Sequence, residues 1–289
     1  MARILARHYR LATYDLSATG SPWQEFVIFT VESDRLRIKP QGTIVLWMIF
    51  TGNDLDEPCH PVFEKKELVR SALATHLLAA IRNFRAHSFV RGLIDRISSE
   101  GSRDVIAAAF LDGSNVLFYA DYVRAAERTY SQVLQHPNYY CLEGTIAAMK
   151  KLAEAKNLTV AIVLVPTKEE VYSWVLKRAR PWSSSRSPSG FSVALRQISE
   201  REGMRFLDLK PLLVDRSKTV FEENGELLWW RDDTHWNSRG NKAVADIVYS
   251  SLLKQSRVPR SNKCAFLTLC RARLGQCGTN SSGPVGSER

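Results

Sequence analysis

The hydrophobic residues of the chain gather in short continuous runs that are separated by polar turns. Three of these runs are long enough to form strands, and they cover residues 43–50, 160–165 and 204–209. The first two are almost entirely apolar and contain β-branched side chains, as is typical of parallel strands that are buried on both faces. The pattern therefore predicts a mainly parallel sheet that is enclosed by other elements.

Helical patterns lie before, between and after these runs. Ser21 is placed to cap a helix that extends through Glu32, and Thr167 with Glu170 has the spacing of a capping box. The helix opened by this box is expected to carry three apolar residues, Val171, Trp174 and Val175. After Asn237, apolar residues again recur at helical spacing. Strands separated by helices predict the α/β class, here a three-layer α/β/α sandwich with a mainly parallel, flavodoxin-like sheet.

The stretch of residues 57–140 is too long for a simple connection between two parallel strands. Four apolar residues within it repeat at helical spacing, namely Leu73, Leu77, Ile81 and Phe84. We therefore expect a helical insertion after the strand that ends in Gly-Asn-Asp, with its arginines on a solvated face rather than on a membrane or an acidic substrate. Residues 1–255 are expected to form one domain. Residues 256–289 are rich in Ser, Gly, Asn and Arg and are expected to be a basic, disordered tail.

The net charge of +10 first suggests an acidic partner such as a nucleic acid. Most of the excess lies in the first ten residues and after Ser256, however, so the body of the chain is nearly neutral. We therefore expect no nucleic-acid partner. No run approaches the roughly 20 apolar residues of a transmembrane helix, so no transmembrane segment is expected. The N-terminus also lacks the uninterrupted apolar stretch of a secretory signal, and the sequence leaves the compartment open.

Metal and disulfide chemistry have weak support in the sequence. The five cysteines are an odd number at irregular spacing, which predicts no disulfide framework. Cys264, Cys270 and Cys277 form no CxxC pair and have no nearby histidine, so no zinc site is expected. The carboxylates around Asp54 and Asp232 fit no metal-binding spacing either. We predict no metal and no cofactor.

Two short polar segments carry the candidate chemistry. Gly52-Asn53-Asp54 follows the most apolar strand, at the sheet edge where α/β proteins bind ligands, although a simple turn would have the same sequence. Asp232 and Asp233 precede His235 in the loop before the last helix. A carboxylate at this distance can accept the Nδ1 proton of the imidazole and leave Nε2 as a general base. Alternatively, the two aspartates are solvated and His235 only forms hydrogen bonds near the helix cap at Asn237.

Three tryptophans surround this loop, namely Trp229, Trp230 and Trp236. They could stack on the rings of a sugar substrate. Aromatic residues beside a loop more often close the edge of the core, which is the alternative interpretation.

The order and spacing of these segments resemble the SGNH (GDSL-type) hydrolase family. Residues 51–54 are similar to its third motif block, and Asp232 or Asp233 with His235 is similar to its last block. Gly20 is similar to the glycine of the second block. Three further segments resemble a subgroup related to the alginate-acetylation proteins, namely residues 164–172, 206–211 and 233–237. That type places Asp-His ahead of the serine, whereas this chain has Asp-His last, in the ordinary SGNH order.

The resemblance implies an α/β/α fold and acyl transfer without a metal. His235 would act as the base, and Asp233, or Asp232 in its place, would orient the imidazole. The side-chain amide of Asn53 and the backbone N–H of Gly20 would stabilise the oxyanion. The substrate implied is an acyl ester of a small molecule or a glycan.

The resemblance also predicts a nucleophilic serine in a Gly-Asp-Ser block upstream of Gly20, where the chain has no such sequence. Ser17 and Ser21 do not match the motif. We therefore expect the chain to begin inside the domain, without its first strand and its nucleophile, with exposed sheet edges and marginal solubility. The predicted function is an ester hydrolase or O-acyltransferase that is inactive in this chain. The alternative is a non-catalytic glycan-binding or assembly component derived from such an enzyme.

Overall fold

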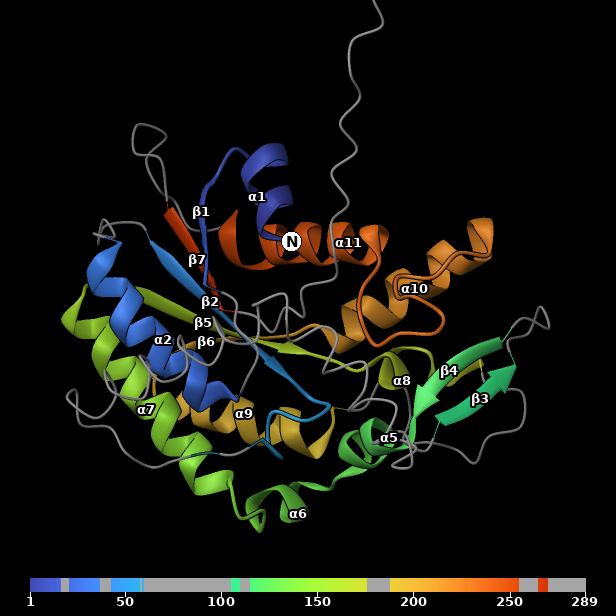
Figure 1. The fold of residues 1–289 in the computed structure, drawn as a ribbon, viewed down its shortest axis with the longest axis horizontal. Coiled ribbons are helices and arrows are strands. Elements are labelled where there is room, and N and C mark those ends of the chain that lie inside the picture. The colour runs from blue at the N-terminus through green and yellow to red at the C-terminus, as the bar shows by residue number, and fades with distance from the viewer. Residues whose placement is uncertain are drawn as a thin grey trace, which may run out of the picture.

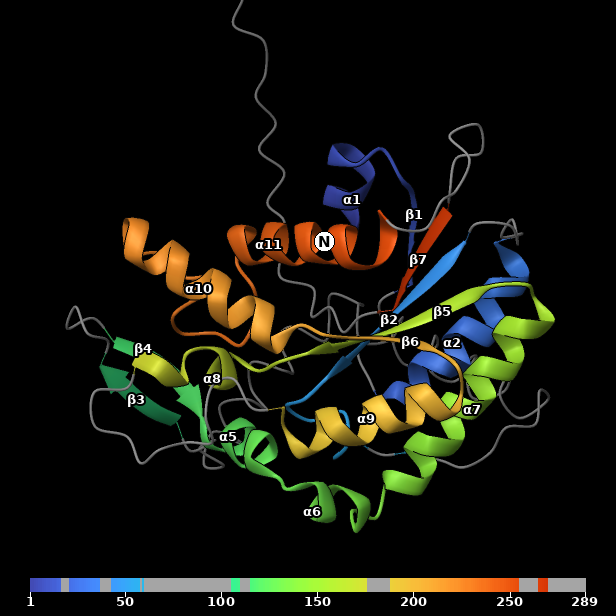
Figure 2. The same ribbon diagram turned by 180° about the vertical axis from the view of Figure 1, so that it is seen from behind.

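The protein has the predicted α/β architecture, with helices on both faces of a parallel sheet (Figures 1 and 2). The computed structural model describes residues 1–16, 21–36, 43–57, 59, 105–109, 115–175, 188–254 and 265–269. Within these residues the sheet has the strand order β1-β7-β2-β5-β6, and every pairing is parallel. The five strands are β1 Ala12–Asp15, β7 Ala265–Leu269, β2 Ile44–Phe50, β5 Thr159–Val165 and β6 Arg205–Asp208.

The three apolar runs predicted to be strands are confirmed as β2, β5 and β6. Strand β2 is buried almost along its whole length, and its side chains alternate between two cores. Ile44, Leu46 and Met48 pack into one core. Val45, Trp47 and Ile49 pack into the other. A strand that is covered on both faces has no polar alternation, which explains its continuous apolar sequence.

Each core is covered by its own layer of helices (Figures 1 and 2). The first core lies under α1 Ala2–His8, α8 Lys168–Val171, α10 Lys210–Asn224, α11 Ser238–Val248 and the π-helical turn Tyr249–Leu253. The second lies under α2 Pro22–Arg35, α6 Tyr130–Leu134, α7 Tyr139–Ala155 and α9 Gly190–Arg201. The described helices include none that is long and apolar enough to cross a membrane.

Two of the predicted helix starts are confirmed in atomic detail. Ser21 caps α2, which extends to Arg35, and Thr167 caps α8, each with a complete capping box. Helix α8 ends at Val171, however. Trp174 and Val175, which were expected in the same helix, lie in the 3-10 turn Ser173–Val175.

Residues 256–289 were expected to be a disordered tail, but Ala265–Leu269 within them form strand β7. This strand lies between β1 and β2 and is parallel to both, with Ala265 level with Ala12 and Phe266 level with Ile44. The physical reason is non-local. The facing edges of β1 and β2 carry backbone N–H and C=O groups that need partners, and a five-residue segment of Ala, Phe, Leu, Thr and Leu can supply them. The other residues of the expected tail, 256–264 and 270–289, lie outside the described residues.

The predicted helical insertion is described only at its end. Residues 60–104, which include the repeat from Leu73 to Phe84, lie outside the described residues. The described part contains an antiparallel pair, β3 Val105–Ala109 and β4 Asn115–Tyr119, followed by α5 Ala120–Glu127 and α6. The described part of this insertion is therefore a mixture of strands and helices rather than helical throughout.

A disulfide joins Cys59 and Cys141, although the cysteine spacing predicted none. The two residues are 82 positions apart in the sequence, and their Cα atoms lie 6.0 Å apart. The fold brings the segment after β2 against the first turn of α7, and this pairing cannot be read from cysteine spacing alone.

Candidate functional site

Two loops carry the candidate residues, and both are connected to the carboxyl ends of β2 and β5. The first follows β2 directly, and the second is bound by α8, the helix that follows β5. The strands end level with each other, because Phe50 pairs with Val165. Both the backbone N–H and the hydroxyl of Thr51 donate to the carbonyl of Val165, at 2.9 and 3.2 Å. The Asn53 loop, residues 51–57, therefore starts beside the segment that leads into α8. Helix α8 in turn contacts the Asp-His loop, residues 229–237.

His235 and Asp233 form a hydrogen-bonded pair. Nδ1 of His235 lies 2.7 Å from Oδ1 of Asp233, and both side chains are about half exposed. Burial raises the pKa of the Asp233 carboxyl, but the hydrogen bonds from His235 and Thr234 outweigh burial and leave the pKa below its usual value. An ionised carboxylate can only accept, so the Nδ1 proton belongs to His235 and Nε2 is the ring atom that can take a proton. Asp232 is exposed and is not the partner in this pair.

The Asp-His loop is closed by its own backbone. Trp229 and Trp236 form an isolated antiparallel bridge, and the Trp230 N–H donates to the His235 carbonyl at 3.1 Å. Asn237 caps α11, with its side-chain oxygen accepting from Arg239 and Gly240 N–H. The helix cap that was considered as the alternative setting of His235 is therefore present together with the Asp233 contact.

The three tryptophans of this loop have different environments. Trp229 is buried, and its ring lies edge-on to that of Trp236, with 6.0 Å between the ring centroids. Trp230 is 56% exposed. Trp229 therefore closes the core edge, while Trp230 is the ring that solvent and solutes can reach.

Lys168, the first residue of α8, binds the backbone of the Asp-His loop. Lys168 is buried, and its ammonium group donates to the carbonyls of Trp230, Arg231 and Asp233. Tyr172, just after the helix, accepts a hydrogen bond from the Leu228 N–H at 2.8 Å. The sequence predicted the capping box at Thr167 and a family resemblance over residues 164–172, but it indicated no role for Lys168. A run of charged residues directly after a buried strand was the available signal for a structural role.

Two buried carboxylates, Glu169 and Glu170, follow Lys168 in the sequence. Glu169 accepts from the Tyr119 N–H at 2.9 Å, which ties α8 to β4. Burial raises the pKa of Glu170 to about 7, against the opposing effect of Lys210, whose ammonium lies 3.5 Å from the carboxylate. Helix α8 therefore concentrates ionisable groups inside the protein beside the candidate site.

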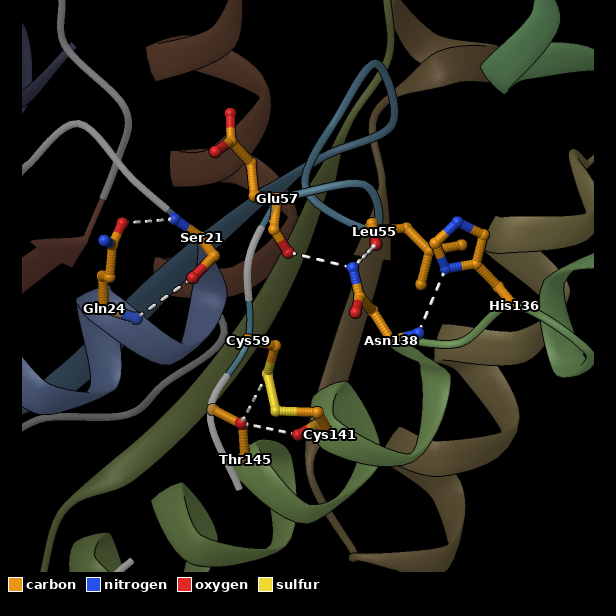
Figure 3. Close-up of a disulfide and its surroundings, with 9 residues drawn as sticks. All are labelled: Ser21, Gln24, Leu55, Glu57, Cys59, His136, Asn138, Cys141 and Thr145. Carbon is orange, nitrogen blue, oxygen red and sulfur yellow. Dashed lines mark hydrogen bonds between the residues drawn. A yellow bond between two sulfur atoms is a disulfide. The ribbon is translucent and has the colours of Figure 1, made fainter. Parts of the chain in front are cut away.

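The Asn53 loop is fixed mainly from the other side of the sheet (Figure 3). The side-chain amide of Asn138 donates to the carbonyls of Leu55 and Glu57, at 3.0 and 3.1 Å. The Cys59–Cys141 disulfide fastens the chain directly after this loop. The side-chain amide of Asn53 itself donates to Glu57 at 2.8 Å. The loop thus has the features of a well-anchored turn, and Asn53 is engaged within it.

The remaining predicted positions are placed as follows. Gly20 and Ser17 lie outside the described residues. Ser21 uses its hydroxyl to accept the Gln24 N–H as a helix cap. Within the described residues, no three His, Cys, Asp or Glu side chains are grouped so that they could hold a metal ion.

Comparison with known families supplies one match. Residues 117–278, more than half of the 289-residue chain, match the SGNH hydrolase-like domain of acetyltransferase AlgX. The matched range contains Lys168, Asp233 and His235, whereas Asn53 lies outside it. The comparison with curated proteins gave no match.

Proposed function

Because the chain belongs to the family of the SGNH hydrolase-like domain of acetyltransferase AlgX, we propose that it provides the base of an acyl-transfer site for acyl esters. The observation that carries this proposal is the 2.7 Å contact between Asp233 and His235, on a loop held at the carboxyl end of the sheet. A histidine oriented by an ionised carboxylate is the general base that ester hydrolysis and O-acyl transfer both require.

The chemistry follows from the state of this pair. Nε2 of His235 takes the proton of a nucleophilic hydroxyl as its oxygen attacks the ester carbonyl. Asp233 stabilises the imidazolium that forms, and the same proton is then given to the departing alcohol. In this scheme Asn53 would release Glu57 and turn its amide toward the oxyanion. One such donor is worth about 3 to 4 kcal/mol of barrier.

The nucleophile is the missing component of the scheme. The chain contains no Gly-Asp-Ser sequence, so the 289 residues are proposed to be inactive by themselves. The ester is proposed to be an O-acyl group of a glycan. The exposed ring of Trp230 supports this substrate class, because it lies on the loop of the proposed base and can stack on a sugar.

The test begins with the codons on both flanks of the 289 residues, because the alginate-acetylation type places the serine after the Asp-His pair and the ordinary SGNH order places it before. If they encode a strand and a Gly-Asp-Ser block in frame, the extended protein is assayed with p-nitrophenyl acetate and with an acetylated glycan, beside the 289-residue chain. The extended form is expected to be active. His235→Ala should lower its kcat on the order of a million-fold, and Asp233→Asn on the order of ten-thousand-fold. His8→Ala, in helix α1, is the matched control and should change little.

Two results would contradict the catalytic proposal. One is esterase activity of the extended protein that survives His235→Ala, because the activity would then arise elsewhere. The other is the absence of an in-frame serine block on either flank of the 289 residues.

The second candidate function is glycan binding or assembly without catalysis. It is favoured by the engagement of Asn53 with Glu57 and by the exposure of Trp230. Isothermal titration of the 289-residue chain with acetylated and deacetylated glycans tests it. Binding that is lost in Trp230→Ala and kept in His235→Ala supports this function, whereas the absence of binding to both glycans refutes it.

A further inference from the structure

Lys168 is a charged side chain that the fold buries directly beneath the Asp-His loop. It is 1% exposed. Its ammonium nitrogen lies 2.7 Å from the carbonyl oxygen of Asp233, 3.1 Å from that of Arg231 and 3.2 Å from that of Trp230. A lysine ammonium has three N–H donors, so all three are matched by carbonyls of one short stretch.

This arrangement carries a large desolvation cost. Burial lowers the pKa of Lys168 to about 8, because the charged form has lost most of its water. Within the described part of the chain, no carboxylate forms an ion pair with Lys168. The charge is instead met by carbonyl dipoles and by the more distant Glu169, Asp233 and Asp232. An apolar side chain would avoid this cost, so the lysine is explained better by what it holds than by its own packing.

The stretch that Lys168 holds has no regular secondary structure of its own. Besides the backbone contacts within the loop, three residues of other elements support it, namely Lys168, Tyr172 and Leu117. Tyr172 binds the Leu228 N–H, and the Leu117 N–H donates to the Arg231 carbonyl at 2.9 Å. Lys168 alone among these supports reaches Asp233.

Asp233 is therefore held at both of its ends. Its carbonyl accepts from Lys168, and its carboxylate accepts from His235 and Thr234. A shift of the backbone carbonyl moves the carboxylate as well, because the two are separated only by the Cα and Cβ atoms.

We propose that Lys168 is the positioning residue of the Asp233–His235 pair, and that it fixes the Asp233 backbone so that the carboxylate meets Nδ1. That this positioning serves catalysis rests on the proposed function, whereas the hydrogen bonds of Lys168 and Asp233 do not depend on it. Loss of the ammonium group would leave Leu228 and Arg231 anchored and would release the loop at Asp233.

The experiment uses the full 289-residue chain and a signal that belongs to the pair. A proton shared between a histidine Nδ1 and a carboxylate gives a low-field proton NMR resonance, which His235→Ala identifies by its disappearance. Lys168→Met keeps an unbranched side chain that is one atom shorter and removes the donors. Lys151→Met, at an exposed lysine of α7, is the matched control.

The wild type and Lys151→Met are expected to show the resonance. Lys168→Met should lose it, or exchange the proton with solvent at least tenfold faster, while circular dichroism shows a folded protein. Lys168→Gln, which keeps a donor, is the second variant if Lys168→Met does not fold, and it should give an intermediate exchange rate.

An unchanged resonance in a folded Lys168 variant would overturn the proposal, even if the melting temperature falls, because the lysine would then be only structural. The readout does not depend on acyl transfer. An extended protein without esterase activity would therefore refute the proposed function and leave the role of Lys168 standing.

Discussion

Strand β7 offers the most stringent test of the fold, because it inserts a C-terminal segment between two strands from the first fifty residues. Leu267 is the central residue of this strand and is level with Tyr14 on one side and Val45 on the other. A proline at this position has no N–H to donate and is not tolerated in the interior of a sheet. Leu267→Pro should therefore disrupt the pairing of β7 with its neighbours.

The size of the effect follows from the pairing. Loss of one buried backbone hydrogen bond costs about 1 to 3 kcal/mol when its partner stays unsatisfied. Strand β7 pairs at four positions with β1 and at four with β2, so its displacement affects both ladders. We expect a loss of at least about 3 kcal/mol, out of the 5 to 15 kcal/mol that is typical of a domain. For a chain of this size, that corresponds to a fall in melting temperature of roughly 6 to 12 °C.

The assay is thermal unfolding of the purified chain, followed by circular dichroism. Ser282→Pro, in the same C-terminal segment but after β7, is the matched control and should melt like the wild type. Equal melting temperatures for Leu267→Pro and Ser282→Pro would refute the placement of β7. The marginal solubility expected from the sequence stays a prediction, and Leu267→Pro should make it worse because it uncovers the edges of β1 and β2.

Two further predictions concern buried chemistry. Cys141→Ser removes a disulfide with a sequence separation of 82 and should cost about 2 to 5 kcal/mol of stability. A reductant should lower the melting temperature of the wild type but not that of the variant. Equal responses of the two proteins to the reductant would contradict the pairing with Cys59. For Glu170, burial raises the pKa from 4.5 to about 7, against the opposing effect of Lys210, so its stabilising contribution is complete below pH 4.5 and is lost as the pH rises through 7. Denaturant titrations from pH 4 to 8 should show this loss, on the order of 3 kcal/mol, in the wild type and not in Glu170→Gln, and parallel pH profiles would contradict the shift.

The parts of the fold that the sequence predicted are those set by local patterns. Strands β2 and β5 appear as apolar runs because each is buried by a core on either face. The cap at Thr167 depends on a residue only three positions away. Strand β7 could not be found in this way, since five residues in a polar segment become a strand only because β1 and β2 lie on either side.

In the candidate site, too, the contacts between residues close in sequence could be predicted and those between distant residues could not. Asp233 and His235 are two positions apart, and their contact could be anticipated from that spacing. Lys168 meets Asp233 across 65 positions, and Cys59 meets Cys141 across 82. No spacing rule covers such distances, and only the course of the sheet brings these residues together.

The two loops of the candidate site are also held from opposite faces of the sheet. The Asp-His loop rests on the core that contains Leu228 and Trp229, and α8 fastens it. The Asn53 loop rests on the other core through Leu55 and is fastened by α7 and the disulfide. Since the sheet separates the two sets of supports, they should fail independently. Reduction of the disulfide should loosen the Asn53 loop and leave the low-field His235 resonance in place, whereas Lys168→Met should remove the resonance and leave the disulfide intact. A change that moved both loops together would mean that the sheet itself, rather than either support, sets the geometry of the site.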